Sequence, residues 1–359
     1  MICLVDLPPP VHGMSAMNSK FIKLFENKVV INTAPSFASN YFGKRIWILF
    51  KLLIFPKIYF LIIFYRLKGH KYCYRSINGG VGQLFDLTFI LLLRILGVRA
   101  VIHHHSFNYL SRYNKIFRVI AFVLRKDTIH IVLGAKMKDK LIQLYAVEDS
   151  SIHVISNVAL FETVEVDCSN NTRQLIQKPC IGYLSNLTYE KGVGIYIETC
   201  LRLHQLGYNF RATIAGPIRD NGLKKQLESF CEIEGFDYVG PVYGEDKGRF
   251  LKSLDLFLFP SMYRNEAEPL VIYEAASYGA VTISSDFGCL SDVVQSLGGE
   301  VVNYDSNFTE NILKRTSTLL VRLEFKDKFN SQELMNSSIL KNRLVINSFL
   351  AHIDEYSRS

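Results

Sequence analysis

The stretch Leu254-Asp255-Leu256-Phe257-Leu258-Phe259-Pro260-Ser261, followed closely by Asn265-Glu266-Ala267-Glu268-Pro269-Leu270-Val271-Ile272-Tyr273-Glu274-Ala275-Ala276, decides the fold class of this chain. The first run is apolar and predicts a buried strand, and the segment after Pro269 predicts a helix. Proline suits the first turn of a helix because its missing N–H is not needed there. Glu266 is therefore expected in the strand-to-helix loop, and Glu274 just over one turn inside the helix.

The start of this expected helix favours an anion. The free N–H groups of a first helical turn face the preceding loop, and the helix dipole adds positive potential there. A phosphate cradle with a carboxylate on each side fits a ligand that has hydroxyls at both ends and a diphosphate in the middle, as a nucleotide sugar has. The alternative is that the two glutamates are charges on a solvated helix. The preceding strand and the small residues Ala275, Ala276, Ser277 and Gly279 favour the binding interpretation.

Composition indicates a globular protein with room for two domains. The chain has 359 residues, of which 49% are hydrophobic and 21% charged, and this length can supply two separate cores. The seven cysteines are scattered and form no C-x-x-C motif, which predicts reduced thiols in a cytosolic protein. The apolar run at residues 1–7 predicts a buried strand and not a signal peptide.

Apolar, strand-like runs alternate with helical segments along the whole chain. This rhythm is typical of parallel, doubly wound α/β sheets. The polar stretch 162–178 predicts a linker, which gives an N-terminal Rossmann-like domain over residues 1–165 and a C-terminal one over 166–339, with a terminal helix over 340–359. The expected strands lie near residues 1–7, 29–32, 71–77, 100–105, 129–134, 151–156, 180–185, 210–216, 237–240, 255–260, 281–286 and 299–304.

Charge is distributed unevenly between the two halves. Residues 1–165 hold 21 Lys and Arg against 9 Asp and Glu, and residues 166–359 hold 20 against 24, so the net charges are +12 and −4 and sum to the total of +8. A basic half attracts anionic partners. No helix-turn-helix, zinc-finger or RNP-like run occurs, so we expect no nucleic acid among them.

Residues 46–65 suggest which anionic partner is expected. They read IWILFKLLIFPKIYFLIIFY and are flanked by further basic residues. The run is long enough to span a bilayer, but Lys51, Pro56 and Lys57 interrupt it, and a central lysine costs roughly 2.5–3.5 kcal/mol on insertion. Three interpretations remain: a helix lying in the membrane interface, which we favour, a buried domain helix, or a true span. The first predicts contact with an anionic membrane surface.

The segment at residues 265–276 resembles the E-x7-E signature of retaining glycosyltransferases of the GT-B fold, most closely family 4, the glycosyl transferases group 1. The positions that match the signature are Glu266, Leu270, Glu274 and Ala275. The resemblance implies two Rossmann-like domains facing across a cleft, with the last helix crossing back onto the first domain. The chain departs from the family at residues 267–269, which stand where Gly-Phe-Gly is usual. The loss of two glycines changes how closely the backbone can approach a phosphate.

The segment Gly182-Tyr183-Leu184-Ser185-Asn186-Leu187-Thr188-Tyr189-Glu190-Lys191-Gly192 resembles the family motif G-R-L-x-x-x-K-G. The resemblance implies that Lys191 and the amides near Leu270 and Val271 bind the donor diphosphate. Asn186 stands where the family has arginine, which removes a positive charge and a bidentate donor. Taken alone, Lys191 also fits a solvated loop lysine.

Two features of the N-terminal half extend the expected site. Pro8-Pro9-Pro10-Val11-His12-Gly13 ends the first strand, and Gly13 fits either an ordinary turn or, by resemblance, the family's ligand-binding loop. His103-His104-His105 ends a strand, so that His103 and His105 share one face. They fit a metal site, structural histidines, or a sugar- or phosphate-binding histidine. The family has a histidine here that His105 matches best and His103 second.

Further features complete the expected site. Gly216 ends a strand in a turn that shapes the nucleoside pocket by resemblance, and Arg264 is a possible ligand contact. No D-x-D motif occurs. Glycosyltransferases of the GT-A fold commonly bind a metal through that motif, so we expect no metal and no cofactor, with Lys191 and backbone amides stabilising the diphosphate instead.

The resemblance implies a retaining, metal-independent glycosyltransferase that uses a UDP- or GDP-linked sugar. It assigns Glu274 to the ribose, Glu266 to the sugar and its transition state, and His105 to the sugar or its phosphate. The acceptor is expected to be a lipid-linked saccharide in surface polysaccharide assembly, such as O-antigen or capsule, on the cytoplasmic face of the membrane. The alternatives are a nucleotide-sugar epimerase of the same fold and a non-catalytic subunit of a membrane complex.

Overall fold

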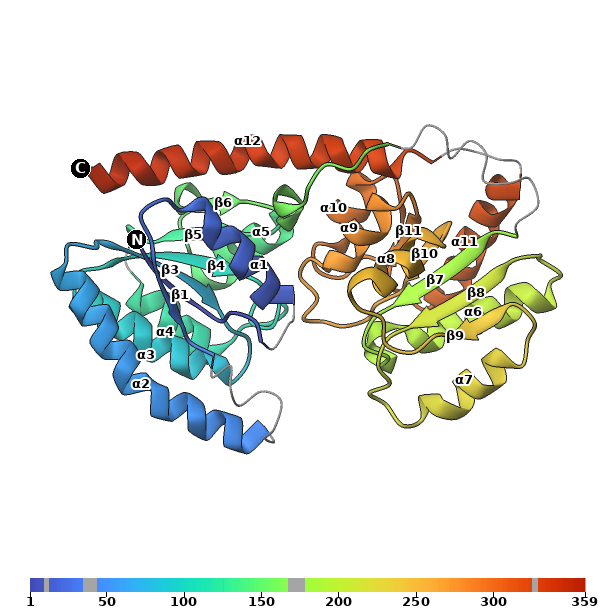
Figure 1. The fold of residues 1–359 in the computed structure, drawn as a ribbon, viewed down its shortest axis with the longest axis horizontal. Helices are drawn as coiled ribbons and strands as arrows, with labels where there is room; N and C mark the ends of the chain where they lie inside the picture. The colour runs from blue at the N-terminus through green and yellow to red at the C-terminus, as the bar shows by residue number, and fades with distance from the viewer. Residues whose placement is uncertain (10–12, 35–43, 125, 167–177, 325–328, 359) are drawn as a thin grey trace. The chain divides into compact units, whose positions relative to one another are not determined.

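The computed structural model describes residues 1–9, 13–34, 44–124, 126–166, 178–324 and 329–358. The side chains of residues 44–52, 324 and 354–358 lie outside this description, as does most of the linker expected at 162–178. The chain forms two compact units. Unit 1 comprises Met1–Phe161 and Lys341–Ser359, and unit 2 comprises Glu162–Leu340. Each is built from a parallel six-stranded sheet covered by helices (Figure 1), which confirms the predicted fold class.

The sheet of unit 1 has the strand order β2-β1-β3-β4-β5-β6, and all of its neighbouring strands pair in parallel. The chain moves from β1 outward to β2, then returns past β1 to β3, so the strand order reverses between β1 and β3. The strands are β1 (Ile2–Val5), β2 (Val29–Asn32), β3 (Tyr72–Ile77), β4 (Arg99–His104), β5 (Ile129–Val132) and β6 (Ile152–Val154).

Alternating side chains of this sheet build two cores, one on each face. Tyr74 packs with α1 and the end of α12, whereas its neighbour Cys73 packs with α2 and α3 on the other face. The helices of unit 1 are α1 (Gly13–Phe21), η1 (Ile22–Leu24), α2 (Lys44–Leu67), α3 (Gly82–Ile95), α4 (Lys115–Val123), α5 (Ala135–Tyr145), η3 (Asp149–Ser151) and η4 (Asn157–Leu160). Helix α12 (Ser331–Arg358) starts in unit 2, and its later turns belong to unit 1.

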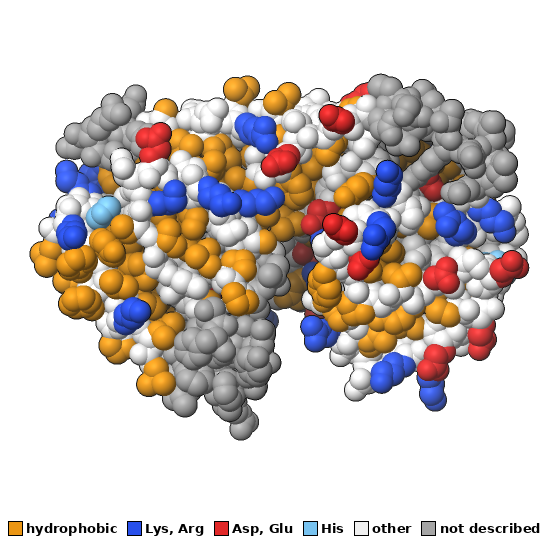
Figure 2. All heavy atoms as spheres, in the orientation of Figure 1, with side chains coloured by type: hydrophobic (Ala, Val, Ile, Leu, Met, Phe, Trp, Pro, Cys, Tyr) orange, Lys and Arg blue, Asp and Glu red, His pale blue; other side chains and the backbone are white. Residues whose placement is uncertain are grey.

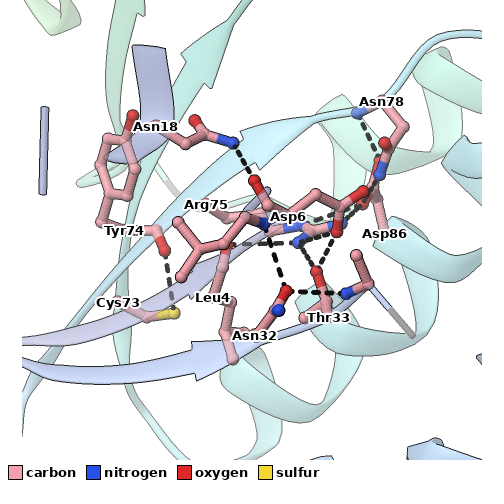
Figure 3. Close-up of polar contacts among 12 residues, drawn as sticks. Leu4, Asp6, Asn18, Asn32, Thr33, Cys73, Tyr74, Arg75, Asn78 and Asp86 are labelled. Atoms are coloured by element: carbon pink, nitrogen blue, oxygen red, sulfur yellow. Dashed lines mark hydrogen bonds and ion pairs between the residues drawn. The ribbon is translucent and has the colours of Figure 1, made fainter. Parts of the chain in front are cut away.

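A buried charge network fastens the carboxyl ends of β1, β2 and β3 (Figure 3). Arg75 is fully buried, and its Nη2 lies 2.5 Å from Oδ1 of the fully buried Asp86 on α3. Its Nη1 donates to the hydroxyl of Thr33 at 2.8 Å and lies 3.9 Å from Asp6. Asp86 also accepts from the backbone N–H of Asn78 at 2.8 Å. Because each buried charge has an opposite charge and further hydrogen bonds, the cost of desolvating it is offset.

The sheet of unit 2 has the order β12-β11-β10-β7-β8-β9 and is again parallel. Along the chain, β7, β8 and β9 lie side by side toward one edge of the sheet. The chain then returns to the other side of β7, where β10, β11 and β12 lie side by side toward the opposite edge, so the strand order reverses between β7 and β10. The strands are β7 (Cys180–Leu184), β8 (Arg211–Ala215), β9 (Phe236–Tyr238), β10 (Leu256–Phe259), β11 (Val281–Ser285) and β12 (Glu300–Val302).

Buried strands and flanking helices form the core of unit 2. Ile181, Tyr196 and Phe230 belong to one cluster that joins the sheet to α6 and α7. The helices are η6 (Tyr189–Lys191), α6 (Val193–Gln205), α7 (Leu223–Cys231), α8 (Gly244–Lys252), α9 (Leu270–Ser277), α10 (Leu290–Ser296) and α11 (Phe308–Glu324). Pro269 has extended backbone angles and precedes α9, one residue earlier than the first-turn position that we predicted.

Residues 46–65 belong to one continuous helix, α2, which runs through Pro56. Phe55, Ile58 and Ile62 are buried against the sheet and α3, so this face of the helix is part of the domain core. The opposite face is exposed. The interpretation as a core helix therefore describes one face, and the interpretation as an interfacial helix stays a prediction for the other. Among the described residues, we find no helix with the length and hydropathy needed to cross a membrane.

Candidate functional site

Two predicted site residues of unit 2, Lys191 and Glu266, lie together where its strand order reverses. In open parallel sheets, the crevice at the carboxyl ends of the strands beside such a reversal is the usual ligand site. In unit 2 the reversal lies between β7 and β10. Lys191 follows β7 and Glu266 follows β10, so the two loops that carry them leave adjacent strands at the same edge.

The loop after β7 is fixed on several sides. Thr188 caps η6 by accepting from the backbone N–H of Lys191, and the hydroxyl of Tyr183 donates to the carbonyl of Lys191 at 2.9 Å. Gly192 has a φ of 86°, and a Cβ there would lie 2.1 Å from the carbonyl oxygen of Pro260. Only glycine allows this approach, so the Lys-Gly pair sets Lys191 directly beside the loop that follows β10.

The loop after β10 is fastened to the loop after β11 through its backbone. The N–H of Cys289 donates to the carbonyl of Ala267 at 3.0 Å. Gly288 has a φ of 56°, and a Cβ on it would lie 1.9 Å from the carbonyl oxygen of Glu266. The hydroxyl of Ser285 donates to the carbonyl of Ser261. These contacts hold the Glu266 backbone in place beside the ends of β10 and β11.

Lys191 and Glu266 form an ion pair in this site. The Lys191 Nζ lies 2.5 Å from Oε2 of Glu266, and their side chains are 20% and 10% exposed. The same Oε2 accepts from the Ser261 hydroxyl at 3.3 Å. The ammonium also lies 4.5 Å from the centre of the Tyr263 ring, an attractive cation–π arrangement. The site therefore presents one cation that can meet a diphosphate and one carboxylate that can accept from hydroxyls.

Glu274 is held by a different lysine. It lies on α9, and its Oε2 is 2.6 Å from the Nζ of Lys247 on α8. Both side chains are about one-third exposed, at 29% and 32%, so the carboxylate remains open to solvent on one side. Lys247 was not predicted as a site residue, because nothing in the local sequence marks a lysine in α8 as a partner for a residue on α9.

A second buried acid lies within the loop. Glu268 is only 7% exposed, and the hydroxyl of Tyr273 donates to its Oε1 at 2.6 Å. This carboxylate stands where the resembled family has phenylalanine, so the departure adds a negative group to the loop just before α9. A negative charge is favourable at the start of a helix, which explains how the loop accommodates it.

The remaining predicted residues of unit 2 differ in exposure. Leu270 and Val271 open α9 and are partly buried. Asn186 and Arg264 are exposed. Gly216 has a φ of 130°, and a Cβ there would lie 1.7 Å from the carbonyl oxygen of Ser185. The glycine therefore lets the ends of β7 and β8 approach each other, which is a structural role.

The predicted residues of unit 1 lie in a region of their own. His103 lies on β4 and His105 directly follows this strand, with their ring centres 4.0 Å apart, whereas Gly13 opens α1. The hydroxyl of Tyr74 is hydrogen-bonded to Nδ1 of His103 at 2.7 Å. Burial, and then the neighbouring imidazoles of His105 and His104, hold the pKa of His103 well below its usual range. His103 is therefore neutral near pH 7, and His105, which is less buried, is the more accessible of the two.

A metal site receives no support from the described part of the chain. Within residues 1–9, 13–34, 44–124, 126–166, 178–324 and 329–358, no three His, Cys, Asp or Glu side chains are grouped so that they could hold a metal ion.

Comparison with known proteins identifies a family over much of unit 2. Residues 171–314 match the family model described as Glycosyl transferases group 1. The chain is 23% identical to alpha-D-kanosaminyltransferase of Streptomyces kanamyceticus, over 57% of each chain. It is 27% identical to the amylovoran biosynthesis glycosyltransferase AmsK of Erwinia amylovora, over 31% of this chain and 29% of AmsK. The chain thus spans little more than half the length of the first of these relatives, and less of the second.

A solved structure shows the same fold along the whole chain. The crystal structure of Anabaena Alr3699/HepE in complex with UDP superimposes with a TM-score of 0.69 and 16% identity, covering 98% of this chain and 99% of that one. The superposition therefore includes both sheets of this chain. This likeness shows the GT-B fold, and the match to the glycosyl transferases group 1 extends over residues 171–314 of the chain.

Proposed function

We propose that this chain is a retaining glycosyltransferase that moves a sugar from a nucleotide-sugar donor to a saccharide acceptor. One observation carries the proposal: the ion pair between Lys191 and Glu266, where the strand order of unit 2 reverses. The family match supports the class of reaction. The complexes of HepE with UDP and with UDP-glucose make a uridine nucleotide the first donor to test.

The two partners of the ion pair would take separate roles when a donor binds. Lys191 would turn from the carboxylate to the diphosphate and neutralise charge that grows as the bond from the sugar to the diphosphate breaks. Glu266 would accept hydrogen bonds from sugar hydroxyls and stabilise the positive charge that develops on the sugar ring. Glu274 would bind the ribose, with Lys247 holding its carboxylate in place. No metal or cofactor enters this proposal.

The remaining groups have assigned places in the proposed reaction. The amides of Leu270 and Val271 would bind diphosphate oxygens, and His105 of unit 1 would contact the sugar or its phosphate. The acceptor hydroxyl would form the new bond to the sugar carbon on the face from which the diphosphate leaves with the bonding electrons, and the acceptor proton would pass to an oxygen of the departing diphosphate. AmsK is named for amylovoran biosynthesis, so we propose a role in polysaccharide assembly, with a lipid-linked acceptor at the cytoplasmic face of the membrane.

The first experiment is a thermal-shift panel of UDP-, GDP- and ADP-sugars. A ligand that binds only the folded chain raises the melting temperature according to its affinity, so one donor should stand out. The matching acceptor assay then compares the wild type with Glu266→Ala. Transfer that is lost in the variant supports the proposal. Donor that is converted to its epimer without acceptor indicates an epimerase, and the absence of any donor effect indicates a non-catalytic subunit.

A further inference from the structure

The outward faces of α2, α3 and α4 in unit 1 carry large apolar side chains. Phe60 on α2 is 67% exposed, Ile95 on α3 is 79% exposed and Phe122 on α4 is 83% exposed. Figure 2 shows hydrophobic side chains gathered over the part of unit 1 where Figure 1 draws α2. The other exposed apolar residues of the three helices are Leu53, Ile63, Phe64, Leu67, Leu84, Leu91 and Val119.

These side chains form one stripe on each helix. On α2 the exposed residues follow helical spacing from Leu53 through Phe60 to Leu67, while the opposite side of this helix packs into the core. Helix α3 packs against both α2 and α4. The three stripes therefore lie on neighbouring helices that cover the same face of one sheet. We name this surface, the exposed residues of α2, α3 and α4, the outer helix face.

The charges on the outer helix face have one sign. Between Glu26 and Asp127 the chain has sixteen Lys and Arg and a single acidic residue, Asp86. Asp86 is fully buried and paired with Arg75, so it contributes no negative charge to the surface. Exposed basic residues lie within or beside the stripes, namely Lys57, Lys68, Arg94, Lys115 and Arg118.

We propose that the outer helix face docks on an anionic lipid bilayer. Apolar and aromatic side chains would enter the boundary between headgroups and acyl chains, and the basic residues beside them would meet anionic headgroups. A protein partner with an acidic rim could satisfy the charges, but the exposed apolar residues are spread over three helices, an arrangement that suits the wide boundary of a bilayer. The link to lipid-linked acceptors rests on the proposed function, whereas the docking itself does not.

The test is cosedimentation of the full chain with vesicles. Wild-type protein should bind vesicles that contain phosphatidylglycerol, bind phosphatidylcholine vesicles far less, and be released as salt rises, because salt screens exposed charges. The double variant Phe60→Ser with Phe122→Ser should lower the partition coefficient by about tenfold or more, since each phenylalanine loses apolar burial. The matched control is Leu206→Ser, at a residue of unit 2 that is 65% exposed, and it should bind as the wild type does.

Two double variants that remove basic side chains measure the electrostatic contribution to vesicle binding. Lys57→Gln with Lys68→Gln should weaken binding to the anionic vesicles about tenfold or more, because each basic residue near such a surface contributes about 1 kcal/mol. Lys224→Gln with Lys225→Gln, exposed on α7 of unit 2, should change little. These substitutions lie on the surface, and an unchanged melting temperature verifies that each variant is folded.

Three outcomes would overturn the docking proposal. In the first, the wild-type protein stays in the supernatant when anionic vesicles are sedimented. In the second, the variants of unit 1 and of unit 2 lose vesicle binding to the same extent. The third is a dimer in solution that Phe60→Ser dissociates while vesicles bind nothing, which would assign the face to a second copy of the chain. Donor binding in the thermal-shift panel is measured without vesicles, so failure of the docking and failure of the proposed transfer are distinguishable.

Discussion

Replacing Glu266 by glutamine should change the affinities for a nucleoside diphosphate and for its sugar conjugate in opposite directions. In the unliganded protein the Glu266 carboxylate lies 2.5 Å from the Lys191 ammonium, so a diphosphate must compete with it for the same cation. A charge-assisted hydrogen bond is worth about 1.5–3 kcal/mol. Discounted to about 1 kcal/mol for the solvent exposure of the lysine, its removal should tighten nucleoside diphosphate binding about fivefold.

The sugar nucleotide should respond to Glu266→Gln in the other sense. It gains the same freed lysine but loses hydrogen bonds from its hydroxyls to a carboxylate, so we expect binding to weaken by several-fold. Transfer should fall by about 10²–10³-fold, because the carboxylate no longer stabilises positive charge in the transition state. Isothermal titration measures both affinities, and a product assay measures transfer. The control is Asp246→Asn in the exposed pair with Arg249 on α8, whose side chains are 68% and 74% exposed. If the affinities for the nucleoside diphosphate and for the sugar nucleotide change in the same direction, Glu266 does not compete with the diphosphate for Lys191.

Three further perturbations follow from the described contacts. Arg75→Met should lower the free energy of unfolding by about 3–5 kcal/mol in urea titrations, because it leaves Asp86 buried without its cation; the double variant with Asp86→Leu should recover much of the loss. Burial lowers the pKa of His130 to about 4, below the unfolded value of about 6.5, so the unfolded chain binds more protons between these values. Stability should be retained above pH 6.5 and fall by up to about 3 kcal/mol toward pH 4, and urea titrations of His130→Gln should show a flatter pH dependence. Lys247→Met should raise the KM for the donor about three- to tenfold with little change in kcat, and the Lys247→Arg variant should have a KM close to that of the wild type. If the KM of Lys247→Met equals that of the wild type, Lys247 is not a positioning residue.

Much of the architecture is predictable because strand and helix patterns alternate regularly. Each of the twelve expected strands has a counterpart in the two sheets. The motif around Lys191 and Gly192 also locates the loop after β7, because a glycine after a lysine is required by the positive φ and by the close approach of Pro260. The sequence does not reveal that Lys191 reaches Glu266, since that contact depends on β7 and β10 being neighbours.

The residues that sequence reasoning missed owe their positions to packing between distant segments. Lys247 meets Glu274 because α8 packs on α9, and neither local sequence predicts this. Arg75 left a detectable signal, because it interrupts an otherwise uncharged strand and is followed by Asp86, the one acid in a long basic stretch. Residues 46–65 were ambiguous for a physical reason: the helix is apolar on the face that enters the core and also on the face that does not.

The central claim is that Lys191 and Glu266 form the donor site, and its most direct test is titration of the best nucleotide sugar from the panel into wild type and Lys191→Met. Loss of the only described cation beside Glu266 should weaken binding about tenfold or more, since hydrogen bonds to charged groups contribute about 1.5–3 kcal/mol. The Arg249→Met control on α8 should bind as the wild type does. Equal affinity in wild type and Lys191→Met would contradict the account.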